Sequence, residues 1–271
     1  MSHILYGSQT YPWQMNLEKF HGQVPHMVDV LLRAGFTGME AEICMLEDYY
    51  EDWGKLKALL DEKGVALAAL AIHEPWLLPQ ETDEEFAAAD KDIEFLAHFP
   101  TAKLLLGHVA IDPVREHNLK EKQQNHLACI RDIGRRAAER GVVAVFHPNS
   151  APNSIFRYDE DYDTMFEALA KCDVGYAPDV GHMLNGGIDP LKTIQEHREK
   201  VQHVHFKDMD ADHVWATMGC CIGDFKPIVK YLEDTDYRGW IMTEDESPDA
   251  VQDSDGVVLA DGAYIKICKS N

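Results

Sequence analysis

The chain has 271 residues, 45% of them hydrophobic, which is enough for one large domain with a substantial core. No run approaches the roughly 18 apolar residues of a membrane span, and the first residues, MSHILYGSQTYPW, lack the pattern of a signal peptide. Lys and Arg number 25 and Asp and Glu 47, so the net charge is −22. That charge repels phosphate backbones and anionic membranes, which disfavours nucleic-acid and membrane partners.

The cysteines indicate a reducing environment. Six of them stand at positions 44, 129, 172, 220, 221 and 268, and none forms a CxxC pair. We interpret them as free thiols and do not expect a thiolate zinc site. A cytoplasmic protein is the expectation that follows.

Short apolar runs alternate along the chain with longer amphipathic stretches. The predicted strands begin at Ile4, Thr37, Ala66, Lys103, Val142, Val174, Val201 and Trp240. The predicted helices span 25–34, 52–63, 82–98, 119–140, 159–171, 190–197 and 224–234, and a closing helix lies within 250–271. The helical pattern is clearest in 119–140, where Leu127, Ile130 and Ile133 form one apolar stripe. Gly256 and Gly262 weaken the prediction of the closing helix.

Eight strand–helix alternations are typical of a parallel sheet closed into a barrel. We therefore predict an α/β fold, a (β/α)8 TIM barrel that spans residues 1–271 as a single domain. A doubly wound open sheet is the alternative fold. It usually carries a Gly-rich phosphate loop after its first strand, and the stretch GSQTYPW that begins at Gly7 is not such a loop.

Polar side chains stand at the carboxyl ends of seven predicted strands, which is the face where a TIM barrel places its chemistry. They are Glu40 and Glu42; His73, Glu74 and Trp76; His108; His147; Asp179 and His182; His203, His205 and Lys207; and Glu244, Asp245 and Glu246. The last four strands supply an imidazole, a carboxylate, an imidazole and a carboxylate in turn. Such mixed ligands suit Mn²⁺, Co²⁺, Fe²⁺ or Zn²⁺, whereas Mg²⁺ prefers more oxygen, so we predict a shared metal site.

The period of the seventh strand separates the roles of its polar residues. Side chains two residues apart lie on one face of a strand, so His203, His205 and Lys207 share a face. We assign His205 as a metal ligand and His203 as a packed, hydrogen-bonded residue one layer deeper. Lys207 is placed at the rim as a substrate-binding cation, with an ordinary surface lysine as the alternative.

Four segments resemble the xylose-isomerase-like TIM barrels, the sugar phosphate isomerase/epimerase superfamily. They are DVGHM from Asp179, HVHFKD from His203, GCCIGDFKPIVKYL from Gly219 and YRGWIMTEDESP from Tyr237. The resemblance is close over about 142–250, and GFTGMEAE from Gly35 resembles the second strand of that family more loosely. The resemblance implies one divalent ion held by strands five to eight, most often through Glu, Asp, His and Glu.

Carried over by position, Asp179, His205 and Glu244 match the last three of those ligands. The fifth-strand position is His147, which is similar to the inosose dehydratases, whose fifth strand ends in a YHxH motif; FHPN matches only its first His. Mn²⁺ or Co²⁺ is the favoured ion, with Zn²⁺, Fe²⁺ and Mg²⁺ as alternatives. The resemblance also implies that Gly181 turns the chain and that His182 reaches a substrate oxygen or transfers a proton.

The implied chemistry is removal of a proton next to the carbonyl of a small keto-sugar or keto-cyclitol, with the ion as Lewis acid. Return of the proton elsewhere gives isomerisation or epimerisation, whereas loss of a β-hydroxyl gives dehydration. An epimerase of this superfamily uses two carboxylates, from strands five and eight. Because His147 replaces the first of them, we favour dehydration, with Glu42 or Glu74 left open as a second base.

The remaining residues at the strand ends receive two kinds of role. The candidate catalytic residues are His182, Glu246 and Lys207, and the candidate substrate-binding residues are Glu40, His73, Trp76 and His108. A sugar isomerase or epimerase is the main alternative function, and a sugar-binding barrel without turnover is a remote one. A DNA-repair endonuclease of the superfamily would need several zinc ions and a basic face, which the charge opposes. Assembly into a homo-oligomer is compatible with the sequence.

Overall fold

A computed structural model describes residues 3–109, 114–219 and 221–269. The chain forms two compact units, one comprising the residues up to Ala69 together with those from His203 onward, the other Leu70–Gln202. The main sheet has eight strands in the order β6-β5-β4-β3-β2-β1-β10-β7, and helices connect them along the chain as the sequence predicts. A single domain over residues 1–271 stays a prediction.

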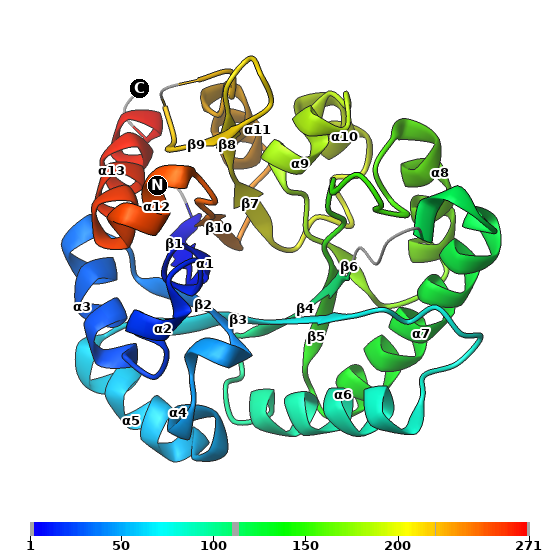
Figure 1. The fold of residues 1–271 in the computed structure, drawn as a ribbon, viewed down its shortest axis with the longest axis horizontal. Coiled ribbons are helices and arrows are strands. Elements are labelled where there is room, and N and C mark those ends of the chain that lie inside the picture. The colour runs from blue at the N-terminus through cyan, green and yellow to red at the C-terminus, as the bar shows by residue number, and fades with distance from the viewer. Residues whose placement is uncertain (1–2, 110–113, 220, 270–271) are drawn as a thin grey trace. The chain divides into compact units, whose positions relative to one another are not determined.

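Four strands of the first unit form a parallel array. They are β1 (Leu5–Gln9), β2 (Gly38–Glu42), β7 (Val204–Phe206) and β10 (Trp240–Thr243). β1 pairs with β2 and β10, and β10 pairs with β7 (Figure 1). The register sets Gln9 beside Glu40 and Ser8 beside Thr243, so the carboxyl ends of these strands lie at one edge. Side chains that follow β2, β7 and β10 therefore meet there.

The helices of the first unit pack around these strands. They are α1 (Tyr11–Gln14), α2 (Leu17–Phe20), α3 (Val24–Ala34), the 3-10 turn η1 (Ile43–Met45), α4 (Asp48–Glu51), α5 (Trp53–Lys63), α11 (Lys226–Asp234), α12 (Pro248–Gln252) and α13 (Ser254–Cys268). α3 and α13 lie side by side (Figure 1). A methyl group at Gly262 would lie 2.4 Å from the carbonyl oxygen of Ala34. The glycine that weakened the predicted closing helix therefore lets the two helices approach closely.

A short antiparallel hairpin follows β7, and the sequence did not predict it. It consists of β8 (Asp208–Met209) and β9 (Trp215–Ala216). The buried carboxylate of Asp208 anchors the loop beyond the hairpin, because it accepts the backbone N–H groups of Gly219 (3.1 Å) and Gly223 (2.9 Å).

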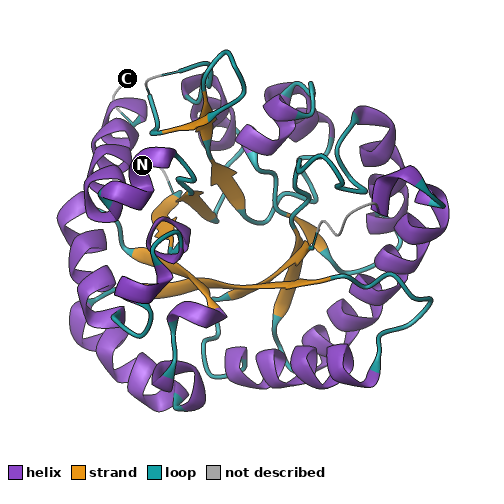
Figure 2. Ribbon diagram, in the orientation of Figure 1, coloured by secondary structure: helices purple, strands orange, loops and turns teal. Residues whose placement is uncertain are grey.

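The second unit repeats the strand–helix alternation. β3 (Ala66–Glu74) passes into it from the first unit and is followed by β4 (Lys103–His108), β5 (Val143–Phe146) and β6 (Gly175–Tyr176). The helical elements of this unit are α6 (Asp83–Leu96), the 3-10 turn η2 (Val114–Glu116), α7 (Leu119–Glu139), α8 (Asp159–Leu169), α9 (Val180–Asn185) and α10 (Pro190–Glu196). β5 pairs in parallel with β4 and β6, α7 packs on β5, and the helices lie outside the strands (Figure 2).

The predicted strands and long helices are present with shifts of a few residues, and two local predictions are wrong. Gly181 does not turn the chain: it lies inside α9, which begins directly after Asp179. The seventh strand begins at Val204, because Val201 forms only an isolated bridge with Tyr176. The short helices α1, α2, α4, α9 and α12 were not predicted.

The cysteines that the structure describes, Cys44, Cys129, Cys172, Cys221 and Cys268, are free thiols, as predicted. Cys220 lies outside the described residues. Among the described helices, none combines the length and the apolar character that crossing a bilayer requires.

Candidate active site

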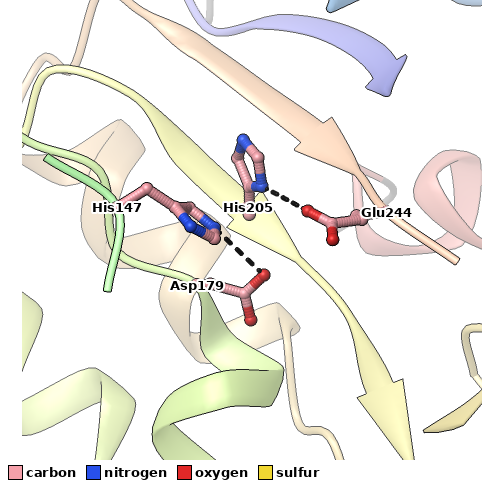
Figure 3. A group of neighbouring side chains, drawn as sticks. All are labelled: His147, Asp179, His205 and Glu244. Carbon is pink, nitrogen blue, oxygen red and sulfur yellow. Dashed lines mark hydrogen bonds and ion pairs between the residues drawn. The ribbon is translucent and has the colours of Figure 1, made fainter. Parts of the chain in front are cut away.

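In the first unit, β7 and β10 bring His205 and Glu244 together. His205 pairs with Met242 in register, and the backbone N–H of Glu244 donates to Phe206 O at 3.0 Å. Nδ1 of His205 lies 2.7 Å from Oε2 of Glu244 (Figure 3). The two side chains are 0% and 5% exposed, so this imidazole–carboxylate pair is formed away from water.

Glu40 joins the same cluster from the middle of β2. Its Oε2 accepts from Nε2 of His203 at 2.6 Å and from Nε2 of His205 at 3.0 Å, and all three side chains are fully buried. Burial opposes ionisation of Glu40, but the charge of His205 and the two hydrogen bonds outweigh it and hold the Glu40 pKa well below its usual range. Burial disfavours the charge on His205, but Glu40 and Glu244 raise its pKa well above the ordinary value. His203 is packed and hydrogen-bonded, as predicted.

Lys207 is fully buried, so the alternative of an ordinary surface lysine is wrong, while its role as a substrate-binding cation stays a prediction. Its Nζ lies 3.0 Å from Oε1 of Glu244 and forms a second ion pair with Glu246. The ring of Trp215, in the hairpin after β7, covers the ammonium at 4.4 Å. The charge of Lys207 is therefore shared between two carboxylates, which it holds in place.

Glu246 is the most exposed carboxylate of this cluster, with 21% of its side chain accessible. Burial raises its pKa to about 7; Lys207 opposes this shift, and Glu244 adds to it. The negative charge of Glu246 also acts on the phenol of Tyr11. Burial, and then the charge of Glu246, raise the pKa of Tyr11 to about 12, so Tyr11 keeps its proton at neutral pH.

The second unit holds a separate pair, His147 with Asp179. His147 directly follows β5, and its backbone N–H donates to Leu106 O at 2.9 Å. Asp179 is the N-cap of α9, where Oδ1 accepts the backbone N–H of His182 at 2.7 Å. Nε2 of His147 lies 3.6 Å from Oδ2 of Asp179 (Figure 3). One oxygen of Asp179 thus starts a helix, while the other faces a buried imidazole.

His182, on the first turn of α9, packs edge-on against His147, with ring centroids 5.7 Å apart. Its Nδ1 accepts the backbone N–H of Ser150 at 3.2 Å. Since a backbone amide always donates, Nδ1 carries the lone pair, and neutral His182 has its hydrogen on Nε2.

The predicted substrate residues of the second unit gather at the ends of β3 and β4. Trp76 and His108 both lie edge-on to His126 of α7, with ring centroids 5.3 and 5.6 Å away. Burial, and then the neighbouring histidines, lower the His108 pKa well below its ordinary value, so this imidazole is neutral. The side chain of His73 is exposed and packs against the backbone of Gly107. A methyl group added at Gly107 would lie 2.3 Å from Cδ2 of His73.

The donor chemistry of both units fits a divalent transition metal. Each unit holds its own pair of a buried imidazole with a buried carboxylate, and mixed nitrogen and oxygen donors suit Mn²⁺, Co²⁺, Fe²⁺ and Zn²⁺. Within the first unit, ligand atoms of Glu40, His203 and His205 also lie within 4.8 Å of one another. The protein therefore has buried histidine and carboxylate groups that are able to hold a metal.

Sequence reasoning missed four residues of these clusters, and some of them left a signal. Ser150 lies three residues after His147 in the same strand-end segment. His126 stands four residues before Ile130, on the apolar stripe of α7, where a histidine is unusual. Tyr11 and Trp215 carry no local pattern, because tertiary contacts alone bring them to the cluster.

Comparison with known proteins places the chain in a family. A model described as xylose isomerase-like TIM barrel matches residues 28–264. The inosose dehydratase of Clostridium beijerinckii is 24% identical over an alignment of 274 positions, which covers 88% of this chain and 87% of that protein.

Two solved structures share the fold at low sequence identity. D-psicose 3-epimerase with D-tagatose, from Clostridium cellulolyticum H10, has a TM-score of 0.77 at 15% identity and covers 98% of each chain. The IOLI protein with a zinc atom has a TM-score of 0.77 at 13% identity, also over 98% of each chain. The predicted (β/α)8 fold class is confirmed, and the chain belongs to the xylose isomerase-like TIM barrel family.

Proposed function

We propose that this protein is a divalent-metal-dependent lyase that removes a proton next to the carbonyl of a keto-sugar or keto-cyclitol and then expels water. The observation that carries the proposal is the burial of two imidazole–carboxylate pairs at strand ends, His147 with Asp179 and His205 with Glu244. The inosose dehydratase relative, which aligns with most of the chain, supports the choice of a dehydration.

The four residues of these pairs would hold one ion, with Mn²⁺ or Co²⁺ favoured and Zn²⁺, Fe²⁺ and Mg²⁺ as alternatives. The zinc atom of the IOLI structure supports a site of this kind on the same fold. When bound, such an ion supplies Lewis-acid polarisation of a carbonyl, which weakens the neighbouring C–H bond.

The other residues of the clusters divide between proton transfer and positioning. Glu246, with a pKa of about 7, is suited to accept a proton at neutral pH and to release it again. His182 presents the hydrogen of Nε2, so it is suited to donate to a departing hydroxyl. Lys207 holds Glu246 and Glu244 through two buried ion pairs. His73, Trp76 and His108 remain the proposed substrate contacts.

The histidine at position 147 favours elimination over epimerisation. An imidazole that ligates a metal has used its free lone pair and is unable to accept a proton from carbon as well. One base and one acid are enough for dehydration: the C–H proton goes to the base, and the β-hydroxyl leaves as water with the proton of the acid. That asymmetry matches Glu246, whose pKa of about 7 suits a base, and His182, whose hydrogen on Nε2 suits an acid.

A sugar isomerase or epimerase is the second candidate function. The observation that favours it is Glu42, a buried carboxylate at the end of β2 whose Oε1 accepts from Nε2 of Gln9 at 3.0 Å. A second base of this kind would let a proton leave one face of the substrate and return on the other.

Metal-loaded protein incubated with 2-keto-myo-inositol and a panel of ketoses in D₂O tests the proposal. We expect an ultraviolet-absorbing, dehydrated diketone from the keto-cyclitol. Interconversion of epimers with deuterium uptake and without loss of water would establish the second candidate instead. Binding of these compounds without any exchange or turnover would identify a sugar-binding barrel.

A further inference from the structure

His205 has both ring nitrogens within hydrogen-bonding distance of a carboxylate. Nε2 lies 3.0 Å from Oε2 of Glu40, and Nδ1 lies 2.7 Å from Oε2 of Glu244. A histidine ligates a metal through one nitrogen only, and the partner of the other nitrogen decides which one that is. Only one of the two carboxylates is therefore able to keep a hydrogen bond from the ring when the other ring nitrogen ligates a metal.

Glu40 is specialised for histidine contacts. A single oxygen, Oε2, accepts from Nε2 of both His203 and His205, whereas Oε1 has no hydrogen-bond partner among the described residues. The hydrogen bonds that the structure gives this side chain thus all run to His203 and His205. A carboxylate has no hydrogen to donate, so both histidines must carry a hydrogen on Nε2.

The surroundings leave little freedom for another arrangement. Glu40, His203 and His205 are all fully buried, so water does not replace either hydrogen bond. Glu40 sits beside Gln9 in the register of β2 with β1, which fixes the height of its carboxylate along the sheet. His203 directly precedes β7 and His205 lies within it; the two side chains, two residues apart, point to the same face, where one oxygen reaches both rings.

We propose that Glu40 is a positioning residue that holds the hydrogen of His205 on Nε2 and so presents Nδ1, on the Glu244 side, as the metal-ligating nitrogen. His203 is the second donor that keeps the Glu40 carboxylate in place. The separation of Nδ1 from the Glu244 oxygen is close to the roughly 3 Å between neighbouring donors on one ion. This inference replaces the substrate contact expected of Glu40, and it rests on the proposed function in that it requires His205 to be a ligand.

The first experiment measures metal affinity in a matched set of variants. Glu40→Gln keeps the shape of the side chain and removes its charge, so the acceptor that faces both histidines becomes a neutral and weaker amide oxygen. We expect Co²⁺ binding, measured by competition with a chromogenic chelator, to weaken about 10–100-fold. Asp161→Asn is the control, because Asp161 is an equally buried carboxylate that accepts the backbone N–H groups of Arg157 and Tyr158 at 2.9 Å. It should lose stability but keep the affinity of the wild type.

The second experiment reads the tautomer directly in the wild type and needs no variant. Protein labelled with ¹⁵N-histidine and loaded with Zn²⁺ is examined by long-range ¹H–¹⁵N NMR. We expect both His203 and His205 to carry hydrogen on Nε2. The change in ¹⁵N chemical shift that zinc binding causes should appear on Nδ1 of His205. Zinc on Nε2 of His205 would overturn the proposal, and so would a folded Glu40→Gln protein with unchanged Co²⁺ affinity.

The two proposals fail in different ways. If the wild type binds neither Co²⁺ nor Zn²⁺, the metal-dependent function fails, and the metal-free NMR spectrum still tests Glu40. In that spectrum the absence of a hydrogen on Nε2 of His205 would contradict the assignment. If the wild type binds metal and turns over no keto-sugar, the positioning role stands and only the activity is withdrawn.

Discussion

Ser150 holds Nδ1 of His182 with both its backbone and its side chain. The backbone N–H donates at 3.2 Å, and the hydroxyl oxygen lies 2.9 Å from the same nitrogen. The side-chain amide of Asn185 donates to that hydroxyl at 2.8 Å, so the hydroxyl hydrogen is left to point at the imidazole. This contact keeps neutral His182 in one tautomer, with its hydrogen on Nε2.

Removal of His182 should therefore cost turnover. We expect His182→Ala to lower kcat by about 10²-fold or more, the usual contribution of a positioned acid or base. Ser150→Ala is the comparison variant, because it removes the hydroxyl and keeps the backbone N–H. Its kcat should fall only a few fold. Steady-state kinetics on the keto-cyclitol measure both, and an unchanged rate in His182→Ala would leave the histidine a structural residue of α9.

The two functions of Asp179 are separable by mutation. Asp179→Asn keeps an oxygen that caps α9 and removes the negative charge from a proposed metal ligand. We expect stability near that of the wild type and a loss of metal affinity larger than about tenfold. Asp179→Ala should show the same metal defect and should also lose about 1 kcal/mol of unfolding free energy with the cap.

Asp189→Asn is the matched control for that prediction. Asp189 caps α10 through the backbone N–H of Lys192 at 3.1 Å and is not a proposed ligand. Metal titration and urea unfolding of the three variants should separate the effect of losing the helix cap from the effect of losing the negative charge. Full metal affinity in Asp179→Asn would remove this residue from the ligand set.

The buried ammonium of Lys207 should be important for stability. Lys207→Met leaves Glu244 and Glu246 without their shared cation, and loss of one partner from a buried pair typically costs about 3 kcal/mol or more. Lys230→Met, which breaks an exposed pair with Asp234 one helical turn away, should change the unfolding free energy little. Equal effects in the two variants, measured by urea unfolding, would contradict a structural role for the buried pairs.

The fold class and the places of the proposed ligands at strand ends were predictable because both depend on local pattern. Apolar runs of four to seven residues separated by amphipathic stretches identify the strands and long helices, and polar residues at strand ends identify the chemistry. The short helix α9 was missed because six residues are too few to show a helical period. The capping role of Asp179 left only a weak trace, an acidic residue directly before the helix.

The environment of each side chain was less predictable than its position. Strand period placed Lys207 on the face of His203 and His205, but its burial depends on glutamates 37 and 39 residues later in the chain. Glu40 was placed at a strand end but lies in the middle of β2, and its partners are two histidines more than 160 residues away. Contacts of that range follow from strand order, and no local sequence pattern records them.

His126 should make stability depend on pH in the mildly acidic range. It is fully buried, and burial lowers its pKa to about 4, although a hydrogen bond between Nδ1 and Pro75 O (3.3 Å) acts in the opposite direction. In the unfolded chain its pKa is near 6.5. Between these two values the unfolded state binds more protons than the folded state, so stability falls as the pH falls from about 6.5 to about 4.

The expected slope is about 1.4 kcal/mol per pH unit, or about 3 kcal/mol over the whole range for this one group. His126→Gln removes the titrating group and keeps an N–H that is able to reach Pro75 O, while His108 and the other histidines remain in both proteins. Urea unfolding of both proteins at pH 7, 6, 5 and 4 gives the difference in unfolding free energy at each pH. Between pH 7 and pH 4 we expect the wild type to lose about 3 kcal/mol more unfolding free energy than His126→Gln does. A constant difference across these values would mean that His126 is reached by water and titrates normally in the folded protein.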